Sequence, residues 1–327
     1  MTNQEKNPDE VECSATDDPA PLQVLTARDV PLGGLRAMTV RRTIPHRDVR
    51  MIGAWCFLDH YGPDRVADTG GMQVARHPHT GLSTVTWLFT GAVDHLDSAG
   101  NAARVVPGEV NLMTAGRGVT HSEFSTDDTD ILHGAQLWLA APEATRHDAP
   151  RFDHFRPEDT AIDGGVARVF LGEWLGAASP IDYPMPIVGA EIVLEAGARW
   201  AAPLNHEFEY GVLLDTGAVQ VDGADLPAHG VAYSAPGRTS TTLLAGPEGA
   251  RLLVIGGVPF EEKIVMWWNF IGRSHEEVVS FRQRYQAELG FEDHPIDGPE
   301  IFGPFPTGTP DPIPAPKLPN ARLVSRN

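Results

Sequence analysis

The sequence predicts an all-β protein made of two jelly-roll-like barrel domains with one short helix near the C-terminus. Three observations support this prediction. Short runs rich in Val, Leu, Thr and aromatic residues alternate with turn residues at close spacing. One well-marked helix signal stands late in the chain. The two halves also contain an internal repeat. We therefore divide the 327 residues into a disordered acidic tail (1–22), a first barrel (23–150), a second barrel (151–290) and a Pro-rich tail (291–327).

The two tails are predicted from their composition. The first 22 residues contain six acidic side chains against the single basic Lys6, which is typical of a disordered segment. Nine prolines lie between Pro295 and Pro319. A proline cannot donate a sheet hydrogen bond and favours extended backbone, so we expect this segment to lie over the globular body or to remain loose.

The predicted strands follow the β-rich runs in order. In the first half these runs are 81–89, 110–114 and 132–140, and turns are predicted at 97–101 and 116–118. In the second half they are 191–194, 210–214 and 252–255. Such short, regularly spaced strands are typical of a barrel or sandwich rather than of an α/β fold.

One helix is predicted after the second set of strands. Ser274 and Glu277 fit a capping box, in which Ser274 is the N-cap and Glu277 stands three residues later. Gly290 suits the C-terminal end. The apolar stripe between them consists of Val278, Phe281, Tyr285 and Leu289.

The internal repeat is short but keeps its order in both halves. Residues 106–117 match 226–238, with the same proline and alanine at an offset of 120 residues. Upstream, Thr-Gly-Ala-Val at 90–93 recurs at 216–219 with an offset of 126. The difference corresponds to one change in loop length, so the chain is predicted to contain two copies of one barrel.

Two motifs in the first copy predict a metal site. His77-Pro78-His79 and His121-Ser122-Glu123 each place two ligand-type side chains two residues apart, so both side chains of a pair point to the same face of a strand. Three neutral imidazoles and one carboxylate suit Fe, Mn, Co, Ni, Cu or Zn, and they would leave positions open for substrate. We predict His77, His79, His121 and Glu123 as ligands of one divalent ion.

The second copy lacks these ligand types. The repeat aligns Pro203, Asn205, Thr241 and Leu243 with the four predicted ligands. The second barrel is therefore predicted to hold no metal. Four further histidines of the first half lack a second ligand at the same spacing and are interpreted as structural or as pocket lining, His60 being the one expected to come nearest the site. They are His46, His60, His95 and His133.

Bulk composition limits the function classes. A formal net charge of −19 opposes direct binding of nucleic acid. No apolar run is long enough to span a membrane, and the N-terminus lacks the basic start and apolar core of a secretory signal. With only Cys13 and Cys56, no disulfide framework is predicted. We expect a cytoplasmic monomer.

The motifs resemble those of the pirin family, a branch of the cupin superfamily. The resemblance lies in residues 77–81 and 113–123, with support from 50–63, 132–138 and the end of the second half, and it covers about residues 30 to 290. It implies two cupin barrels packed face to face, with iron in the N-terminal one bound by the four residues predicted above. Residues 267–273 depart from the family's usual closing motif, which leaves the substrate open.

Three functions remain in view. The first is a quercetin 2,3-dioxygenase-type oxidoreductase that opens a flavonol-like enol with dioxygen, with Fe(II) as Lewis acid and Glu123 as base for the substrate hydroxyl. The second is an iron-dependent regulatory or redox-sensing protein that binds a protein partner. The third is a metal-dependent isomerase or hydrolase, since fold does not fix function.

Overall fold

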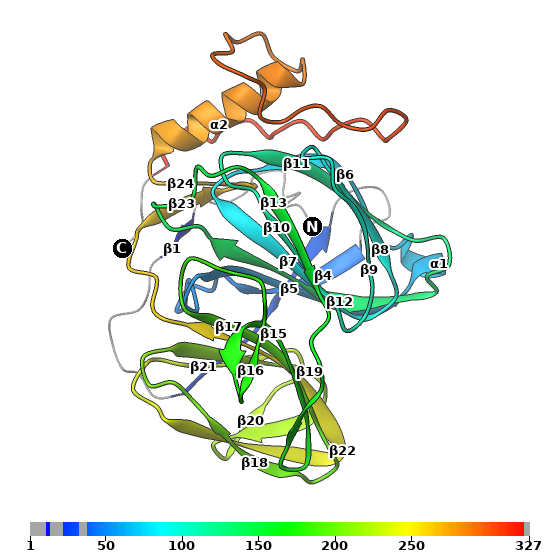
Figure 1. The fold of residues 1–327 in the computed structure, drawn as a ribbon, viewed down its shortest axis with the longest axis vertical. Coiled ribbons are helices and arrows are strands. Elements are labelled where there is room, and N and C mark those ends of the chain that lie inside the picture. Colours follow the sequence, from blue (N-terminus) through cyan, green and yellow to red (C-terminus); the bar gives the residue numbers. More distant parts are fainter. Residues whose placement is uncertain (1–10, 14–21, 33–37, 324–327) are drawn as a thin grey trace.

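The structure, a computed structural model, confirms the predicted all-β class and the two barrels (Figure 1). It describes residues 11–13, 22–32 and 38–323. One barrel stands above the other in Figure 1, and the C-terminal helix and tail lie over the far end of the first barrel. The predicted acidic tail lies mostly outside the described residues.

The first barrel is formed by two antiparallel sheets. The larger sheet has the order β13-β10-β7-β12-β5-β4-β3, and the smaller sheet has the order β6-β11-β8-β9. The larger sheet contains β3 (Arg28–Leu32), β4 (Met38–Ile44), β5 (Trp55–Arg65), β7 (Leu82–Thr90), β10 (Val110–Thr114), β12 (Ile131–Ala140) and β13 (Arg151–Phe155). The smaller sheet contains β6 (Gln73–His79), β8 (Val93–Asp97), β9 (Ala102–Val105) and β11 (Val119–Ser125); a short helix, α1 (Val66–Thr69), precedes β6.

The second barrel is one sheet of ten strands, with the main order β14-β15-β17-β22-β19-β21-β2. It contains β2 (Gln23–Leu25), β14 (Thr160–Ile162), β15 (Gly165–Trp174), β16 (Ala177–Ala178), β17 (Ile187–Leu194), β18 (Arg199–Pro203), β19 (Glu209–Val221), β20 (Ala224–Leu226), β21 (Val231–Ser234) and β22 (Ser240–Gly257). Although β2 falls within the range assigned above to the first barrel, it pairs with β21 of the second barrel. A strand that precedes the first barrel in sequence therefore completes the second barrel.

The strand positions follow the internal repeat. An offset of 126 residues carries β6 onto β18, and β7 with β8 onto the long β19. An offset of 120 carries β10 onto β21, and β11 onto the start of β22. The second copy fills its interior with apolar side chains, including Leu243 at the position that corresponds to Glu123.

The apolar core continues from one barrel into the other. Trp87 of β7 stacks on Phe170 of β15, with ring centroids 4.6 Å apart. Polar contacts cross the same interface: Trp55 Nε1 donates to the Gly256 carbonyl at 3.1 Å, and the Gly53 amide donates to Glu209 Oε2 at 2.6 Å. The two barrels are therefore joined by a packed apolar interface that also contains buried hydrogen bonds.

The predicted helix is present as α2 (His275–Glu288). The Ser274 hydroxyl accepts a hydrogen bond from the Glu277 amide at 3.2 Å, as the N-cap prediction requires. The Glu277 carboxylate instead accepts from the amide of Arg273 at 2.6 Å, one residue earlier than a capping box would place it. Gly290 has φ +72° at the C-terminal end, where a side chain would be strained.

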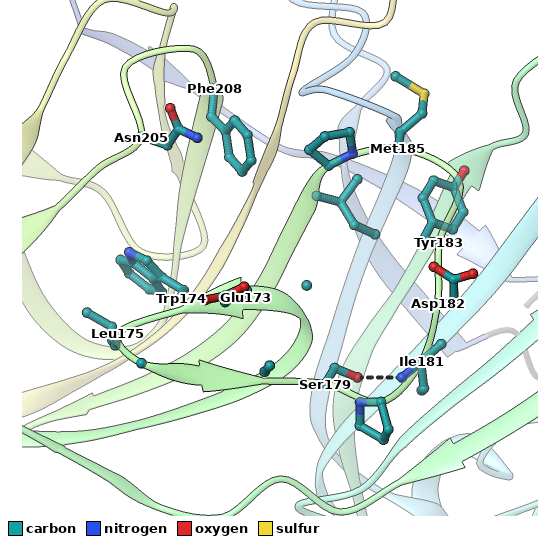
Figure 2. A pocket seen from close by; sticks show the side chains of 16 residues that line it. Glu173, Trp174, Leu175, Ser179, Ile181, Asp182, Tyr183, Met185, Asn205 and Phe208 are labelled. Atoms are coloured by element: carbon teal, nitrogen blue, oxygen red, sulfur yellow. Dashed lines mark hydrogen bonds between the residues drawn. The ribbon is translucent and has the colours of Figure 1, made fainter.

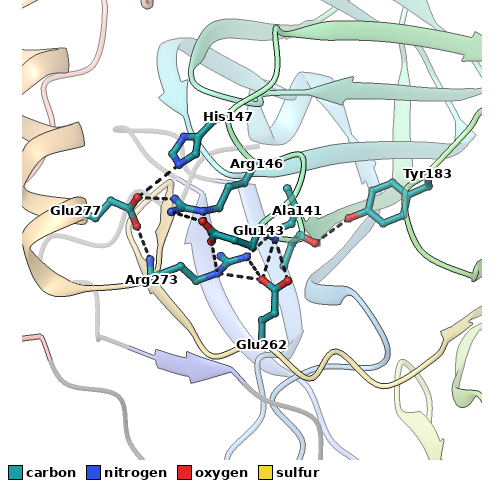
Figure 3. A network of polar contacts seen from close by, with 9 residues as sticks. Ala141, Glu143, Arg146, His147, Tyr183, Glu262, Arg273 and Glu277 are labelled. Atoms are coloured by element: carbon teal, nitrogen blue, oxygen red, sulfur yellow. Dashed lines mark hydrogen bonds and ion pairs between the residues drawn. The ribbon is translucent and has the colours of Figure 1, made fainter.

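A small sheet and an ion-pair network attach α2 to the first barrel. The sheet contains β1 (Val11–Cys13), β23 (Ile264–Trp267) and β24 (Phe270–Gly272). In Figure 3, Arg146 bridges Glu143 and Glu277, while Arg273 contacts Glu262 and donates to the Ala141 carbonyl at 2.8 Å. The loop after β12 is thereby tied to the start of α2.

The Pro-rich segment lies over the globular body. The Ala315 amide donates to Gln286 Oε1 at 2.8 Å, and Tyr285 Oη donates to the Ile313 carbonyl at 2.6 Å. Phe302 is fully buried, and its carbonyl accepts from Thr120 Oγ1 of β11 at 2.9 Å. The segment therefore packs against α2 and against the outer side of the sheet that contains the predicted ligands.

Candidate metal centre

The register of the smaller sheet brings the predicted ligands together. β11 lies between β6 and β8, and His121 of β11 is directly opposite His77 on β6. His79 lies two pairs further along, opposite Val119, and the register shifts between His121 and Glu123. His77, His79 and His121 from two neighbouring strands therefore point into one small volume of the barrel.

The three imidazoles form a compact buried cluster. One ring nitrogen from each of His77, His79 and His121 lies within 4.8 Å of the other two, and all three residues are fully buried. The Nε2 atoms have no hydrogen-bond partner among the described residues. Since a buried polar atom without a partner is costly, three such atoms in one place indicate that something else satisfies them.

Burial keeps these imidazoles neutral. It lowers the pKa of His77 to about 3, and it places the pKa of His79 and of His121 well below the ordinary value. His77 Nδ1 lies 2.9 Å from the Ala75 carbonyl, so this nitrogen carries the ring hydrogen and leaves the lone pair of Nε2 free. A neutral imidazole with a free Nε2 lone pair is the form that binds metal.

Glu123 and a residue missed from the sequence complete the cluster. Glu123 is buried and lies directly opposite His95 of β8. Ligand-type atoms of His95, His121 and Glu123 also lie within 4.8 Å of one another. His95 was interpreted above as structural or pocket lining. The signal for it was His95-Leu96-Asp97, which has the same spacing of two residues as the recognised motifs.

The donor set fits a divalent transition metal. Neutral imidazoles suit Fe, Co, Ni, Cu and Zn, and one carboxylate lowers the charge of the complex. The free Nε2 atoms of the three histidines are the structural evidence for this fit. A metal-binding cluster of histidine and glutamate in the first barrel is thus supported by the geometry, and the choice of ion is left to the proposal below.

An aromatic wall faces the cluster from the larger sheet. The Trp138 ring lies 5.2 Å from that of His79 between centroids, and it stacks on Phe57 at 4.0 Å. Tyr61 is fully buried, and burial together with the nearby Glu123 carboxylate raises its pKa well above the ordinary value. The barrel therefore offers flat apolar surfaces and one neutral phenol beside the histidines.

His60, expected above to come nearest the site, belongs to a different cluster. His60 Nε2 lies 2.6 Å from Asp215 Oδ1, and His133 Nε2 lies 2.6 Å from the same oxygen. The three side chains are nearly fully buried and join β5 and β12 of the first barrel to β19 of the second.

The surrounding arginines argue against a cation at this second cluster. Arg41 Nε lies 3.2 Å from His60 Nδ1, and Arg251 Nη2 lies 3.4 Å from His133 Nδ1. A guanidinium can only donate, so both Nδ1 atoms accept and each neutral ring carries its hydrogen on Nε2, facing Asp215. We define His60, His133, Asp215 and Arg251 as the interdomain lock.

A cavity lies elsewhere, on the second barrel. It has a volume of about 650 Å³ and is bordered by Trp174, Phe208, Met185 and Tyr183, with Asp182 and Asn205 at its edge (Figure 2). Trp174 donates to the Pro203 carbonyl at 2.8 Å, so its ring is fixed. None of the predicted metal ligands borders this cavity.

Two barrels of this topology, with histidines and a glutamate inside the first, define a bicupin. Comparison with known proteins gives the family: residues 36–139 match the model described as "Pirin", and residues 189–290 match "Pirin C-terminal cupin domain". The chain belongs to the pirin family. This confirms the resemblance found in the sequence motifs.

Relatives and solved structures agree with this assignment. A Pseudomonas aeruginosa protein named "Putative quercetin 2,3-dioxygenase" is 40% identical over 287 residues, which cover 86% of this chain and 90% of the relative. A "Pirin-like protein" of Caulobacter vibrioides is 34% identical, covering 81% and 92%. A crystal structure of quercetin 2,3-dioxygenase from Acinetobacter baumannii has 35% identity and a TM-score of 0.85, covering 93% of this chain and 98% of that one.

The described residues contain two helices, α1 and α2. In the described part of the chain, neither helix has the length and apolar character required to cross a bilayer.

Proposed function

We propose that this chain is a mononuclear metal-dependent dioxygenase of the quercetinase type, which opens a flavonol-like enol with dioxygen. His77, His79, His121 and Glu123 are its metal ligands, and Fe(II) is its ion. The observation that carries the proposal is the convergence of three buried, neutral imidazoles whose Nε2 atoms have no other partner among the described residues. The names of the Pseudomonas and Acinetobacter relatives supply the substrate class.

The chemistry divides between the ion and the side chains. A divalent metal supplies Lewis-acid polarisation of substrate oxygen atoms. Glu123 accepts the proton of the enol hydroxyl, since it is a buried carboxylate within the cluster and a carboxylate can act as a general base there. The stacked pair of Trp138 and Phe57 offers a flat apolar wall that suits an aromatic substrate.

Cysteine usage supports a reducing, cytoplasmic location as part of the same proposal. Cys56 is buried, and its thiol lies 3.6 Å from the Trp138 carbonyl. The sequence contains only one other cysteine, Cys13. A chain with this usage does not depend on disulfides for its stability.

The test is oxygen uptake by Fe(II)-loaded protein supplied with quercetin. We expect uptake that is lost in His121→Ala, which removes a ligand, and strongly reduced turnover with metal retained in Glu123→Gln, which removes the base. A matched control is His154→Ala, because His154 lies on β13 at the outer edge of the larger sheet and belongs to none of the histidine clusters. Iron-loaded protein without uptake would refute the quercetinase proposal, and full turnover in Glu123→Gln would refute the base.

A further inference from the structure

His95 has no role in the proposed function, yet it is buried beside two of the predicted ligands, His121 and Glu123. It is 4% exposed on β8, directly opposite Glu123, and its ring lies 4.8 Å from that of Phe152 between centroids. Asp97 follows two residues later, opposite His121. The side chains of His95 and Asp97 therefore share the inner face of the sheet with His121 and Glu123.

The turn after β8 fixes Asp97. Its Oδ1 atom accepts from the amides of Ala99 and Asn101, both at 2.9 Å, and the Asn101 side-chain amide donates to both carboxylate oxygens. Asp97 Oδ2 lies 3.3 Å from His95 Nε2. An ionised carboxylate can only accept, so His95 Nε2 carries a hydrogen and donates it.

The position of the hydrogen on His95 determines which ring nitrogen of His121 carries hydrogen. With its hydrogen on Nε2, a neutral His95 presents Nδ1 as an acceptor. His95 Nδ1 lies 3.3 Å from His121 Nδ1, so His121 donates there and keeps its Nε2 lone pair free. His121 Nε2 is one of the three Nε2 atoms of the histidine cluster that have no partner among the described residues. The hydrogen-bond directions therefore run from His121 through His95 to Asp97.

We infer that His95 is a positioning residue of the metal centre: Asp97, His95 and His121 form a relay that holds His121 in the tautomer and orientation that bind metal. The inference rests on the proposed metal centre. It extends the familiar arrangement in which a metal-bound histidine donates its other ring hydrogen to a carboxylate or carbonyl, with one imidazole placed between. His77 achieves the same tautomer directly, through the Ala75 carbonyl.

The relay predicts a specific effect on metal affinity. Loss of such a supporting partner typically weakens metal binding about 10- to 100-fold. Asparagine can place an oxygen where His95 Nδ1 lies, so His95→Asn keeps an acceptor for His121. Phenylalanine retains a ring beside Phe152 but accepts nothing, so the pair of variants separates hydrogen bonding from packing.

The experiment is competition for Co(II) between the apoprotein and a chelating dye, with thermal unfolding of each apoprotein to verify its fold. We expect His95→Phe to bind Co(II) about 10- to 100-fold more weakly than wild type, and His95→Asn to remain within about threefold. Equal affinity of wild type and His95→Phe would overturn the relay while leaving the metal centre intact. Loss of binding in His95→Asn as complete as in His121→Ala would make His95 a ligand itself and would also overturn it.

A second measurement does not depend on any variant. In the wild-type apoprotein, ¹⁵N NMR of the imidazoles reports which ring nitrogen carries hydrogen. We expect His121 protonated on Nδ1 and His95 on Nε2. The opposite tautomer of His121 would overturn the relay. Failure of wild-type protein to bind Co(II), despite the expected tautomers, would instead refute the metal centre on which the proposed function rests.

Discussion

Replacing Asp215 by asparagine tests the interdomain lock. Asp215 is fully buried, its Oδ1 lies 2.6 Å from Nε2 of both His60 and His133, and its Oδ2 accepts from Arg251 Nε at 2.5 Å. His60 and Arg251 donate to its two oxygens, and His133 Nε2 is in close contact with Oδ1. The amide of asparagine has one oxygen, so in either orientation its NH₂ group must face a donor. Asp215→Asn therefore loses the charge and creates a donor–donor contact.

The magnitude follows from the burial of the partners. Breaking a buried ion pair by removing one partner costs about 3–5 kcal/mol. The Arg251 side chain is 26% exposed, so water recovers part of its loss, whereas His60 has no exposed surface. We expect a destabilisation of about 3 kcal/mol, the lower end of that range, which corresponds to a fall in Tm of roughly 6–12 °C.

The assay is calorimetric unfolding at neutral pH, with Asp225→Asn as the matched control. Asp225 is an exposed carboxylate of the same barrel, whose oxygen accepts from Gln220 Nε2 at 2.9 Å. We expect the control to change stability by less than about 0.5 kcal/mol. Equal effects of the two substitutions would refute the assignment of Asp215 as the centre of a lock between the barrels.

The lock also predicts how stability depends on pH. Burial lowers the pKa of His60 to about 4, so between about pH 6.5 and pH 4 the unfolded chain binds a proton that the folded chain does not. Burial would raise the pKa of Asp215, but hydrogen bonds from His133 and His60 outweigh it and lower that pKa. Both groups therefore remove stability as the pH falls, His60 by about 3 kcal/mol below pH 4. The same change in stability between pH 7 and pH 5 in His60→Gln and in the wild type would contradict this.

Four further substitutions have defined outcomes. Gly116→Ala should lower the free energy of unfolding in urea by at least about 2 kcal/mol, because φ is +52° and a Cβ would lie 2.1 Å from the Asp148 carbonyl oxygen. Gly223→Ala is the control: φ is +83° but the space around it is open, so it should lower that free energy by only about 1 kcal/mol. Ser274→Ala should cost about 1 kcal/mol in the same assay by removing the N-cap of α2. Burial raises the pKa of Glu209 to about 6, so its contribution to the free energy of unfolding falls as the pH rises from 4.5 through 6. Glu209→Gln should abolish this pH-dependent contribution, and unfolding measured at pH 5 and at pH 7 would detect the change.

The strands and the helix were predictable because their signals are local. The run 110–114 is β10, and the predicted turn at 97–101 joins β8 to β9. The N-cap at Ser274 needed only residues within one turn of the helix. The motif spacing of two residues also indicated which side chains share a face, because strand geometry has a period of two.

Non-local pairing was beyond prediction from the sequence. His60 and Asp215 are 155 positions apart, and nothing in either neighbourhood indicates the other. His95 was interpreted as structural or as pocket lining because no second ligand was recognised at the same spacing, although Asp97 stands two residues later. The register of β8 against β11 shows that Asp97 supports both the turn and the histidine. Similarly, no local feature of β2 indicates that it pairs with the second barrel.

The two copies of the barrel indicate how the histidine cluster affects the free energy of folding. In the second copy, Leu243 stands where the first has Glu123, and the interior around it is apolar. The first copy instead buries three imidazole Nε2 atoms that have no partner among the described residues. A buried unpaired polar group costs about 1–3 kcal/mol, so three such Nε2 atoms without a ligand would oppose folding by several kcal/mol relative to an apolar filling. The core shared by both barrels, including Trp87 against Phe170, offsets that cost and holds the strands in the register that brings the histidines together.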